Sequence, residues 1–339
     1  MLFLAPDAEL PIDSSDLALT LGNFDGVHRG HQTLIDRTAI AAGQHGLALA
    51  VLTFTPHPAR VLARAGGSRR PPLLLTTPAD KRLLISRAGA NILIEKRFTP
   101  TLAVMEAERF AQEVLFESLR VRHLVVGYDF VFGAGRRGTP GLLRHWGAAR
   151  GVTVEVAEAW SDPVEGVASS SRIREALSAG RVESAAVLLG RPYHLTGAVV
   201  QGAQRGRLLG FPTANLRGDN ELVPQPGVYA GFLDWGEGQR PVAISVGDNP
   251  TFGDTGFSVE AHAFGPGDEP PALSLYGRTC RLSFVARLRD MTRFEGPDAL
   301  PRLVAQIRED VSTSRAVLSR TPPPISFFEP PELEPAACP

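Results

Sequence analysis

Residues 22–31 read GNFDGVHRGH, and this glycine-rich stretch decides how the first part of the chain is expected to fold. The apolar run Leu17–Leu21 precedes it, and a segment with a helical pattern, residues 32–42, follows it. This order predicts a strand, a tight turn and a helix N-terminus, where backbone N–H groups and the helix dipole face an anion. His28 and His31 then lie where the phosphates of a nucleotide would bind.

Two interpretations of this histidine pair are open. A nucleotidyl-transfer site needs hydrogen-bond donors and mobile positive charge at the α-phosphate, not a covalent nucleophile, and imidazoles supply both. The alternative is a turn whose histidines cap a helix or pair with carboxylates. The flanking glycines and the strand–turn–helix context favour the nucleotide site.

The composition limits the class of protein and its partners. The chain has 339 residues, 43% hydrophobic and 21% charged, with a net charge of -1. These values predict a soluble globular protein of two domains, with no global electrostatic reason to bind nucleic acid or a membrane. Lys81 and Lys96 are the only lysines, and no GxxxxGK[ST] motif occurs. A phosphate site must therefore use backbone amides, arginine, histidine or a metal ion.

The cysteines and the N-terminal residues predict a cytoplasmic protein. Cys280 and Cys338 form neither a disulfide framework nor a zinc-binding spacing. Residues 1–10 lack a basic region followed by a long apolar stretch, and no run approaches the length of a membrane span. For Cys280 we expect a buried, unreactive thiol.

The first half of the chain alternates strand-like apolar runs with helical periods. The expected strands are 17–21, 47–54, 92–94, 123–127 and 152–156, and the expected helices are 33–42, 79–88, 107–119 and 141–150. Such alternation predicts a parallel α/β sheet with right-handed crossovers. Ligands of these sheets bind beyond the carboxyl ends of the strands, where residues 23–31 fall.

The second half has a different pattern. Short β-like runs at 197–200, 228–232, 240–246, 258–263 and 280–287 are separated by glycine and proline, which predicts a small antiparallel β-barrel. A helix is expected from residue 297 to about residue 318. The predicted organisation is an N-terminal domain of residues 1–186, a C-terminal domain of residues 187–320, and a poorly ordered proline-rich tail of residues 321–339.

Five further segments carry groups suited to chemistry. Residues 53–58 (TFTPHP) and 127–133 (GYDFVFG) follow strands, and residues 169–174 (SSSRIR) open a helix with hydroxyl caps and arginines, which suits an anion. Residues 202–216 (GAQRGRLLGFPTANL) form a glycine-rich turn in which Thr213 and Asn215 offer the hard oxygen ligands that Mg²⁺ prefers. Glu260, in VEAH, places a carboxylate on a strand.

In this order, the motifs resemble those of the prokaryotic bifunctional riboflavin kinase/FAD synthetase family. The likeness covers residues 17 to 315. The resemblance implies a Rossmann-like nucleotidyltransferase domain that joins FMN to AMP from ATP, releasing pyrophosphate and forming FAD. It also implies a barrel domain that transfers the γ-phosphate of ATP to riboflavin and forms FMN. Riboflavin, FMN and ATP are the implied partners and Mg²⁺ the implied cofactor.

The resemblance also implies a role for each matching residue. His28, His31, Arg172 and Glu260 would be catalytic, Glu260 as the general base on the ribityl hydroxyl. Nucleotide or phosphate contacts are implied for Gly22, Asn23, Phe24, Asp25, Gly26, Ser170, Ser171, Gly206, Arg207, Gly210, Phe211 and Pro212. Asp129, Phe130 and Arg289 would contact the flavin, while Thr213 and Asn215 would bind Mg²⁺ with the ATP phosphates.

Simpler interpretations remain for several of these residues. One alternative is that the serines at 169–171 do no more than cap a helix and that Arg174 is solvated. In the same way, His57 can simply fix a turn, and Glu260 can pair with an arginine. We expect His123 and His262 to be structural. The chain also departs from the family pattern at Thr55, Val131, Ser274 and Met291. Two other functions stay open. One is a flavin-sensing protein without catalysis. The other is an enzyme with a single active module, in which Val131 points to the adenylyltransferase as the inactive one.

Overall fold

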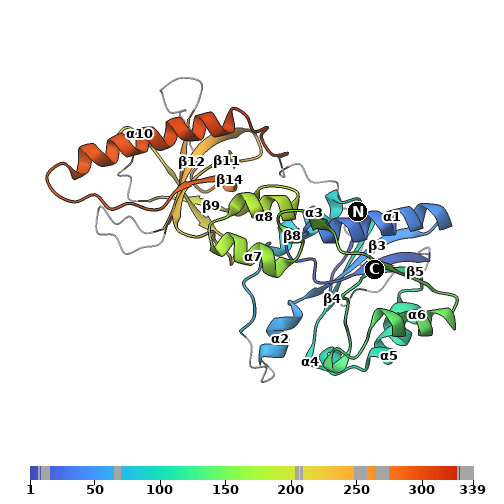
Figure 1. Cartoon of the computed structure of the whole chain (residues 1–339). Coiled ribbons are helices and arrows are strands. Elements are labelled where there is room, and N and C mark those ends of the chain that lie inside the picture. The colour runs from blue at the N-terminus through green and yellow to red at the C-terminus, as the bar shows by residue number, and fades with distance from the viewer. Residues whose placement is uncertain are drawn as a thin grey trace. The chain divides into compact units, whose positions relative to one another are not determined.

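The computed structural model of this chain describes residues 1–6, 8, 16–64, 70–202, 206, 209–247, 258–264, 275–326 and 328. The chain divides into two compact units, Met1–Leu73 with Pro78–Ala168 and Leu74–Thr77 with Ser169–Glu329 (Figure 1). Arg207, Ser274, Cys338 and most of the predicted tail lie outside the described residues. In the part that is described, no helix has the length and apolar character needed to cross a membrane, and the cytoplasmic location stays a prediction.

A six-stranded parallel sheet forms the centre of the first unit. Its strands are β1 (Leu2–Leu4), β2 (Leu17–Leu21), β3 (Ala48–Thr55), β4 (Ile92–Arg97), β5 (Val121–Gly127) and β6 (Thr153–Ala157). They lie in the spatial order β1-β4-β3-β2-β5-β6, and every neighbouring pair is parallel. All five residues of β2 are buried, as expected for a central strand covered on both faces. The chain runs from β2 to one side of the sheet and returns at β5 on the other, so the strand order reverses between β2 and β5.

Helices connect these strands. They are α1 (Arg29–His45), α2 (Pro58–Arg64), α3 (Pro78–Arg87), α4 (Pro100–Ala103), α5 (Ala107–Arg109), the π-helix Phe110–Ser118 and α6 (Pro140–Ala148); β7 (Ser161–Asp162) and β8 (Gly166–Val167) form a short hairpin. Proline begins four of the helices, where its missing N–H costs no hydrogen bond. Thr99 and Thr139 cap α4 and α6 through their hydroxyls.

The second unit is a closed antiparallel barrel. Its strands are β9 (Tyr193–Val200), β10 (Ala214–Gly218), β11 (Gly227–Asp234), β12 (Gln239–Gly247), β13 (Ser258–Ala263) and β14 (Thr279–Arg289), in the order β10-β13-β12-β11-β14-β9. Side chains fill the interior, where Tyr229 and Phe284 are fully buried and meet edge to face with ring centroids 5.3 Å apart. Burial raises the pKa of the Cys280 thiol to about 11, so the thiol is unreactive at neutral pH.

The predicted fold class is confirmed in both units, and the differences concern short or weakly patterned elements. The sequence did not predict β1, β10, α2, α4 or α8 (Val182–Leu189). The strand β10 has one buried residue and two exposed ones, so it lacks the alternation by which strands are recognised. The expected helix 107–119 is a short α-helix that continues as a π-helix, in which Leu119 N–H reaches the Val114 carbonyl.

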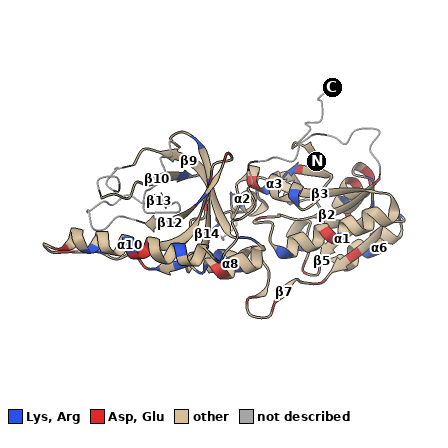
Figure 2. Cartoon of the chain, turned by 90° about the horizontal axis from the view of Figure 1, so that it is seen from above, with Lys and Arg blue, Asp and Glu red and all other residues tan. Residues whose placement is uncertain are grey.

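The helix α10 (Ala299–Leu318) packs on the barrel. Its residue Leu318 joins Ala230, Phe232 and Phe264 in one apolar cluster. The Arg289 guanidinium on β14 donates two hydrogen bonds, of 2.8 and 2.7 Å, to the Asp310 carboxylate on α10. The helix carries Arg302, Arg308 and Arg315, with the adjacent acidic residues Glu309 and Asp310 between the last two, and Figure 2 shows residues of both charges on it. The pair Arg289–Asp310 therefore ties α10 to the barrel wall.

Two more helices, α7 (Ser170–Ser178) and α8, belong to the second unit. The Arg287 guanidinium on β14 donates to the carbonyls of Ala179 and Pro226 and to the side chain of Gln225. Its backbone N–H donates to the Glu183 carboxylate on α8, over 2.8 Å. This network joins both helices to the barrel, and the predicted boundary between residues 186 and 187 stays a prediction.

We expect Arg287→Met to lower the free energy of unfolding of the second unit by about 2–3 kcal/mol. The substitution removes the donor for two partly buried acceptors, the Ala179 carbonyl and the Gln225 side-chain oxygen, and an unsatisfied buried acceptor is costly. Urea denaturation followed by intrinsic fluorescence measures the change. The matched control is Arg278→Met, which breaks an exposed pair with Glu237 and should cost about 0.5 kcal/mol or less. Equal losses in the two variants would contradict this role of Arg287.

Candidate functional site

The turn that follows β2 holds an unusual backbone conformation. Phe24 and Val27 have φ angles of 49° and 41°, in the left-handed region that side chains avoid, above all those branched at Cβ. Tertiary contacts hold this turn in place: Phe24 is completely buried, Gly22 N–H donates to the Leu52 carbonyl, and the Thr53 hydroxyl donates to the Asn23 carbonyl. Such strain is found where a loop must present its groups in one geometry.

His28 both caps α1 and offers a donor. Its Nδ1 atom accepts the backbone N–H of His31 at 3.4 Å, which is the capping role considered from sequence. A neutral imidazole that accepts at Nδ1 carries its proton on Nε2. In this arrangement the N–H of a neutral His28 is on Nε2, and its contact with a phosphate stays a prediction. The rings of His28 and His31 stack with centroids 3.7 Å apart.

His31 is a neutral group at physiological pH. Burial, with smaller effects of His28 and Lys81, lowers the pKa of His31 well below its usual value of 6.5. Its Nδ1 atom is buried and has no hydrogen-bond partner among the described residues. The sequence suggested mobile positive charge on both histidines, whereas the structure makes His31 an uncharged hydrogen-bonding group.

Lys81 supplies a charge behind this turn, and the sequence analysis assigned it no role. It lies on α3, and its Nζ donates to the Thr53 hydroxyl at 3.3 Å. Burial lowers the pKa of Lys81, while the nearby carboxylates of Glu95 and Asp25 oppose that shift. The only signal in the sequence was its rarity, because nearly all basic residues of the chain are arginines.

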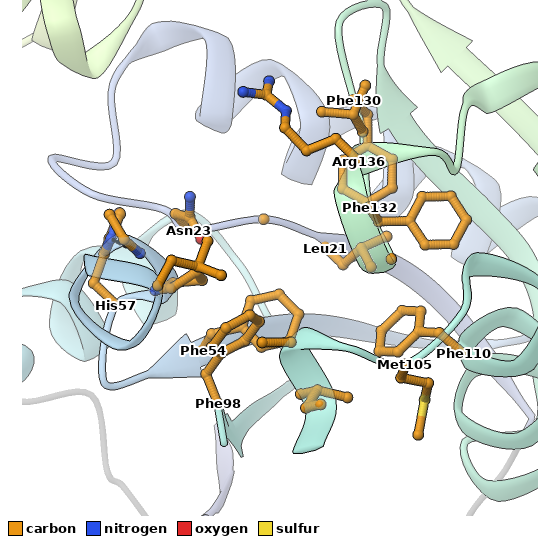
Figure 3. Close-up of a pocket in the computed structure, with 18 of the residues that line it drawn as sticks. Leu21, Asn23, Phe54, His57, Phe98, Met105, Phe110, Phe130, Phe132 and Arg136 are labelled. Atoms are coloured by element: carbon orange, nitrogen blue, oxygen red, sulfur yellow. Dashed lines mark hydrogen bonds between the residues drawn. The ribbon is translucent and has the colours of Figure 1, made fainter. Parts of the chain in front are cut away.

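A pocket of about 460 Å³ opens at the carboxyl edge of the sheet (Figure 3). Residues at the ends of four strands line it: Leu21 to Asn23 after β2, Phe54 on β3, Phe98 after β4, and Asp129 to Gly133 after β5. Figure 3 shows Phe54 and Phe98 on one side of the pocket and Phe130 with Arg136 on the other. The predicted site residues Asn23, Asp129 and Phe130 are thus brought together, as are His57 and Val131. Phe54 belongs to the motif 53–58 but had no role of its own there, and sequence reasoning missed Phe98, Met105, Phe110 and Arg136.

Several predicted residues have structural roles as well. His57 lines the pocket, and its Nδ1 accepts the Ala59 backbone N–H at 3.2 Å, so it also fixes the turn before α2. The Ser169 hydroxyl caps α7 by accepting the Arg172 backbone N–H. Ser170, Ser171 and Arg172 form the first turn of that helix, and their contact with phosphates stays a prediction.

In the barrel, Glu260 faces the predicted metal ligands. Glu260 on β13 and Asn215 on β10 are direct neighbours across the two strands. The Glu260 carboxylate accepts hydrogen bonds from the Thr213 hydroxyl at 3.0 Å and from the Ser258 hydroxyl at 3.4 Å. Gly202 leaves room for Asn215, since a Cβ there would lie 2.3 Å from its amide nitrogen. The structure thus collects Thr213, Asn215 and Glu260 at one place.

The segment before Thr213 is also held in position. His262 Nδ1 lies 2.9 Å from the Pro212 carbonyl, and its ring meets Phe211 edge to face. Phe211 N–H donates to the Gly206 carbonyl, and Gly210 adopts a positive φ of 85°. His262 is therefore structural, as expected, and it positions residues predicted to bind the nucleotide.

The donors near Glu260 fit a metal that arrives with a nucleotide. The described residues contain no cluster of three or more His, Cys, Asp or Glu side chains that would hold a metal by themselves. Thr213 and Asn215 offer neutral oxygens, which suit Mg²⁺ when phosphates supply the negative charge. Arg289, predicted to contact the flavin, has its guanidinium engaged by Asp310, and its flavin contact stays a prediction.

Comparison with known proteins identifies the family. A model of FAD synthetase matches residues 11–171, and a model of riboflavin kinase matches residues 189–318. The bifunctional riboflavin kinase/FMN adenylyltransferase of Escherichia coli K12 is 33% identical over 306 residues, covering 90% of this chain and 94% of the relative. The chain belongs to the bifunctional riboflavin kinase/FMN adenylyltransferase family. This confirms the resemblance seen in the sequence motifs.

A second curated relative carries the same family name, and a solved structure with a different title is similar in fold. The Bacillus subtilis relative of the same name is 35% identical and covers 86% of this chain and 89% of the relative. A crystal structure entitled macrolide-efflux protein, from Streptococcus pneumoniae, matches with a TM-score of 0.80 at 29% identity, over 93% of this chain and 98% of that one. The likeness extends over both units.

The buried, neutral His31 predicts a pH dependence of stability. The unfolded chain, in which a histidine has a pKa of about 6.5, binds one more proton than the native state below that pH. Stability should therefore fall by up to about 1.4 kcal/mol per pH unit as the pH drops below about 6.5, and His31→Asn should reduce this fall. Urea unfolding at about pH 7.5 and about pH 5.5 measures the slope. The exposed His145→Asn serves as control, and a slope unchanged by His31→Asn would contradict the expectation.

Proposed function

We infer that this chain carries out two successive steps of flavin-cofactor synthesis. It phosphorylates riboflavin with ATP to form FMN, and it then adenylylates FMN with a second ATP to form FAD and pyrophosphate. The observation that carries this inference is the presence of two separate groups of chemistry-bearing residues, one in each unit. Each unit also matches the family model of one of the two activities.

We propose that the turn after β2 and the adjoining pocket form the adenylyltransferase site. An oxygen of the FMN phosphate attacks the α-phosphorus of ATP, and the bond to the β-phosphate oxygen breaks to release pyrophosphate. No covalent bond to the protein is needed, so the protein contributes positioning and stabilisation of charge. The Nε2–H of His28, the imidazole of His31 and the first N–H groups of α1 are suited to hold the phosphates.

The pocket is proposed to hold the flavin ring. Its aromatic residues Phe54, Phe98 and Phe130 suit a flat, largely apolar ring system, and its volume of about 460 Å³ lies within the usual range for small-molecule sites. Asn23 lines the pocket and belongs to the same turn as His28, which supports a bound FMN whose phosphate lies toward the histidines.

We propose that Glu260 is the general base of the kinase. It would take the proton of the ribityl 5′-hydroxyl while that oxygen bonds to the γ-phosphorus of ATP and ADP leaves. The hydrogen bonds from Thr213 and Ser258 fix the orientation of its carboxylate. Thr213 and Asn215 would hold Mg²⁺, which neutralises phosphate charge when bound with ATP. Gly206, Gly210, Phe211 and Pro212 would line the nucleotide.

Single substitutions should separate the two activities. His28→Asn keeps a good helix cap but removes the donating imidazole, so FAD formation should slow by about a hundredfold or more while riboflavin phosphorylation is unchanged. Glu260→Gln should slow riboflavin phosphorylation by about 10²–10⁴-fold and leave the conversion of supplied FMN intact. Asn215→Ala should have the same pattern as Glu260→Gln.

Separation of riboflavin, FMN and FAD by chromatography after incubation with ATP and Mg²⁺ measures both half-reactions. Loss of both activities in either folded variant would show that the sites are misplaced. Recovery of riboflavin alone from the unmodified chain would favour a flavin-sensing protein. Accumulation of FMN without FAD would favour a single active module.

We further propose that the second unit acts as a kinase by itself, as the predicted domain of residues 187–320 requires. The contacts of Arg287 with Ala179 and Glu183 support a longer fragment, residues 169–329, as the more stable version. Both fragments should phosphorylate riboflavin, and the longer one should unfold at a higher urea concentration. A longer fragment that folds cooperatively without kinase activity would contradict the proposal.

A further inference from the structure

Arg136 is a cation at the pocket that neither the motifs nor the proposed chemistry explains. It lines the pocket together with Phe130, Phe132 and Asn23, and Figure 3 shows its side chain extending beside Phe130. Its guanidinium is exposed, and within the described part of the chain it forms no ion pair. The other charged or titratable side chains of the lining are Asp129 and His57.

The loop that carries Arg136 is held firmly. Phe132 and Gly138 exchange two backbone hydrogen bonds, of 3.2 and 2.9 Å, across the base of the loop. Ala134 N–H donates to the Met105 carbonyl at 2.8 Å, which ties the loop to the opposite wall of the pocket. Gly133 packs so closely that a Cβ on it would lie 2.6 Å from the Cα of Ala107. The loop therefore cannot shift without disturbing the pocket.

Arg136 itself adopts the left-handed conformation, with a φ of 60°. Residues other than glycine hold this conformation only where their surroundings impose it, and such positions cluster at ligand sites. The neighbouring Arg137 has a φ of -80° and does not line the pocket. Two arginines adjacent in sequence thus differ in position relative to the pocket, and this difference provides an internal control.

The remaining lining offers little to recognise an anion. Val131, an apolar residue at a position where the chain departs from the family pattern, lies in the pocket. The Asp129 carboxylate would repel a phosphate, and His57 Nδ1 is occupied by the Ala59 N–H. Riboflavin and FMN differ only in the phosphate, so a pocket that merely encloses the flavin ring would bind both. An enzyme that works on both flavins needs a group that distinguishes them.

We propose that Arg136 is a specificity-determining residue that binds the phosphate of FMN and makes the adenylyltransferase pocket prefer FMN to riboflavin. The inference rests on the proposed placement of the flavin in this pocket. A guanidinium offers paired N–H donors that match two phosphate oxygens, and such charge-assisted hydrogen bonds are stronger than neutral ones. Riboflavin, which lacks the phosphate, gains nothing from Arg136.

The test uses Arg136→Asn in the full-length chain, because asparagine tolerates the left-handed conformation and carries no charge. Initial rates of FAD formation are measured at varied FMN with ATP and Mg²⁺, with and without riboflavin as a competing ligand, in chains that also carry Glu260→Gln so that riboflavin is not converted to FMN. Riboflavin phosphorylation itself is measured in chains that keep Glu260. We expect the KM for FMN to rise by about tenfold to a hundredfold, while the inhibition constant of riboflavin changes by less than about twofold. The KM for ATP and the rate of riboflavin phosphorylation should be unchanged.

Two further variants control the result. Arg137→Asn removes the same charge one residue away and should leave the KM for FMN unchanged, and Arg136→Lys should restore part of the lost affinity. A rise in the FMN KM matched by an equal rise in the riboflavin inhibition constant would overturn the proposal, since Arg136 would then only shape the pocket. An FMN KM unaffected by Arg136→Asn would overturn it as well.

Phe98→Ala distinguishes this proposal from the placement of the flavin. If Phe98→Ala weakens the binding of both flavins and Arg136→Asn weakens the binding of neither, the pocket is the flavin site and only the role of Arg136 is wrong. If Phe98→Ala has no effect on either flavin, the placement of the flavin is wrong and the role of Arg136 fails with it.

Discussion

The passage of the chain from the buried strand β2 into α1 is the constraint on which the first unit depends. Within a few residues, the backbone must leave the centre of a parallel sheet, exchange hydrogen bonds between strands for hydrogen bonds within a helix, and begin that helix. It does so with Phe24 and Val27 in left-handed conformations, held by the burial of Phe24 and by the bond from Gly22 to the neighbouring strand. Because the strand order reverses beside β2, the same turn borders the crevice in which parallel sheets bind ligands.

Electrostatics at this turn follow from burial. A buried imidazole beside a second imidazole and a lysine loses its charge, so His31 works as a neutral group. Lys81 is attracted by the charges of Glu95 and Asp25 and hydrogen-bonds to the Thr53 hydroxyl, which in turn donates to the Asn23 carbonyl. The Lys81 side chain is thus linked through Thr53 to the backbone of the turn, and the N-terminus of α1 adds the positive end of its helix dipole there.

In the barrel, the register between neighbouring strands brings the proposed site residues together, whereas in the α/β unit these residues meet at the ends of the strands. Register alone makes Asn215 and Glu260 neighbours, and the Thr213 hydroxyl completes the group. On the outside, Arg287 and Arg289 extend from β14 to different helices, the first to α7 and α8 and the second to α10. A single strand therefore positions three helices by ion pairs and hydrogen bonds.

The sequence by itself determined the two fold classes, the order of the elements and the motifs of both activities, because hydrophobic periodicity and turn residues are local properties. It placed Asn23, Asp129, Thr213, Asn215 and Glu260 among the site residues, and the structure brings the first two together at the pocket and the last three together in the barrel. Local pattern could not predict β10, whose alternation is too weak.

Only the tertiary structure decided which distant residues share a site. The pocket is built from the ends of four strands, so Phe54, Phe98 and Arg136 become neighbours through sheet topology, which no local pattern records. Tertiary structure also decided the charge of His31 and the ion-pair partner of Arg289. Burial makes His31 neutral, and the packing of α10 on the barrel places Asp310 against Arg289. The physical reason is the same in each case, since desolvation and contact depend on what surrounds a side chain and not on its sequence neighbours.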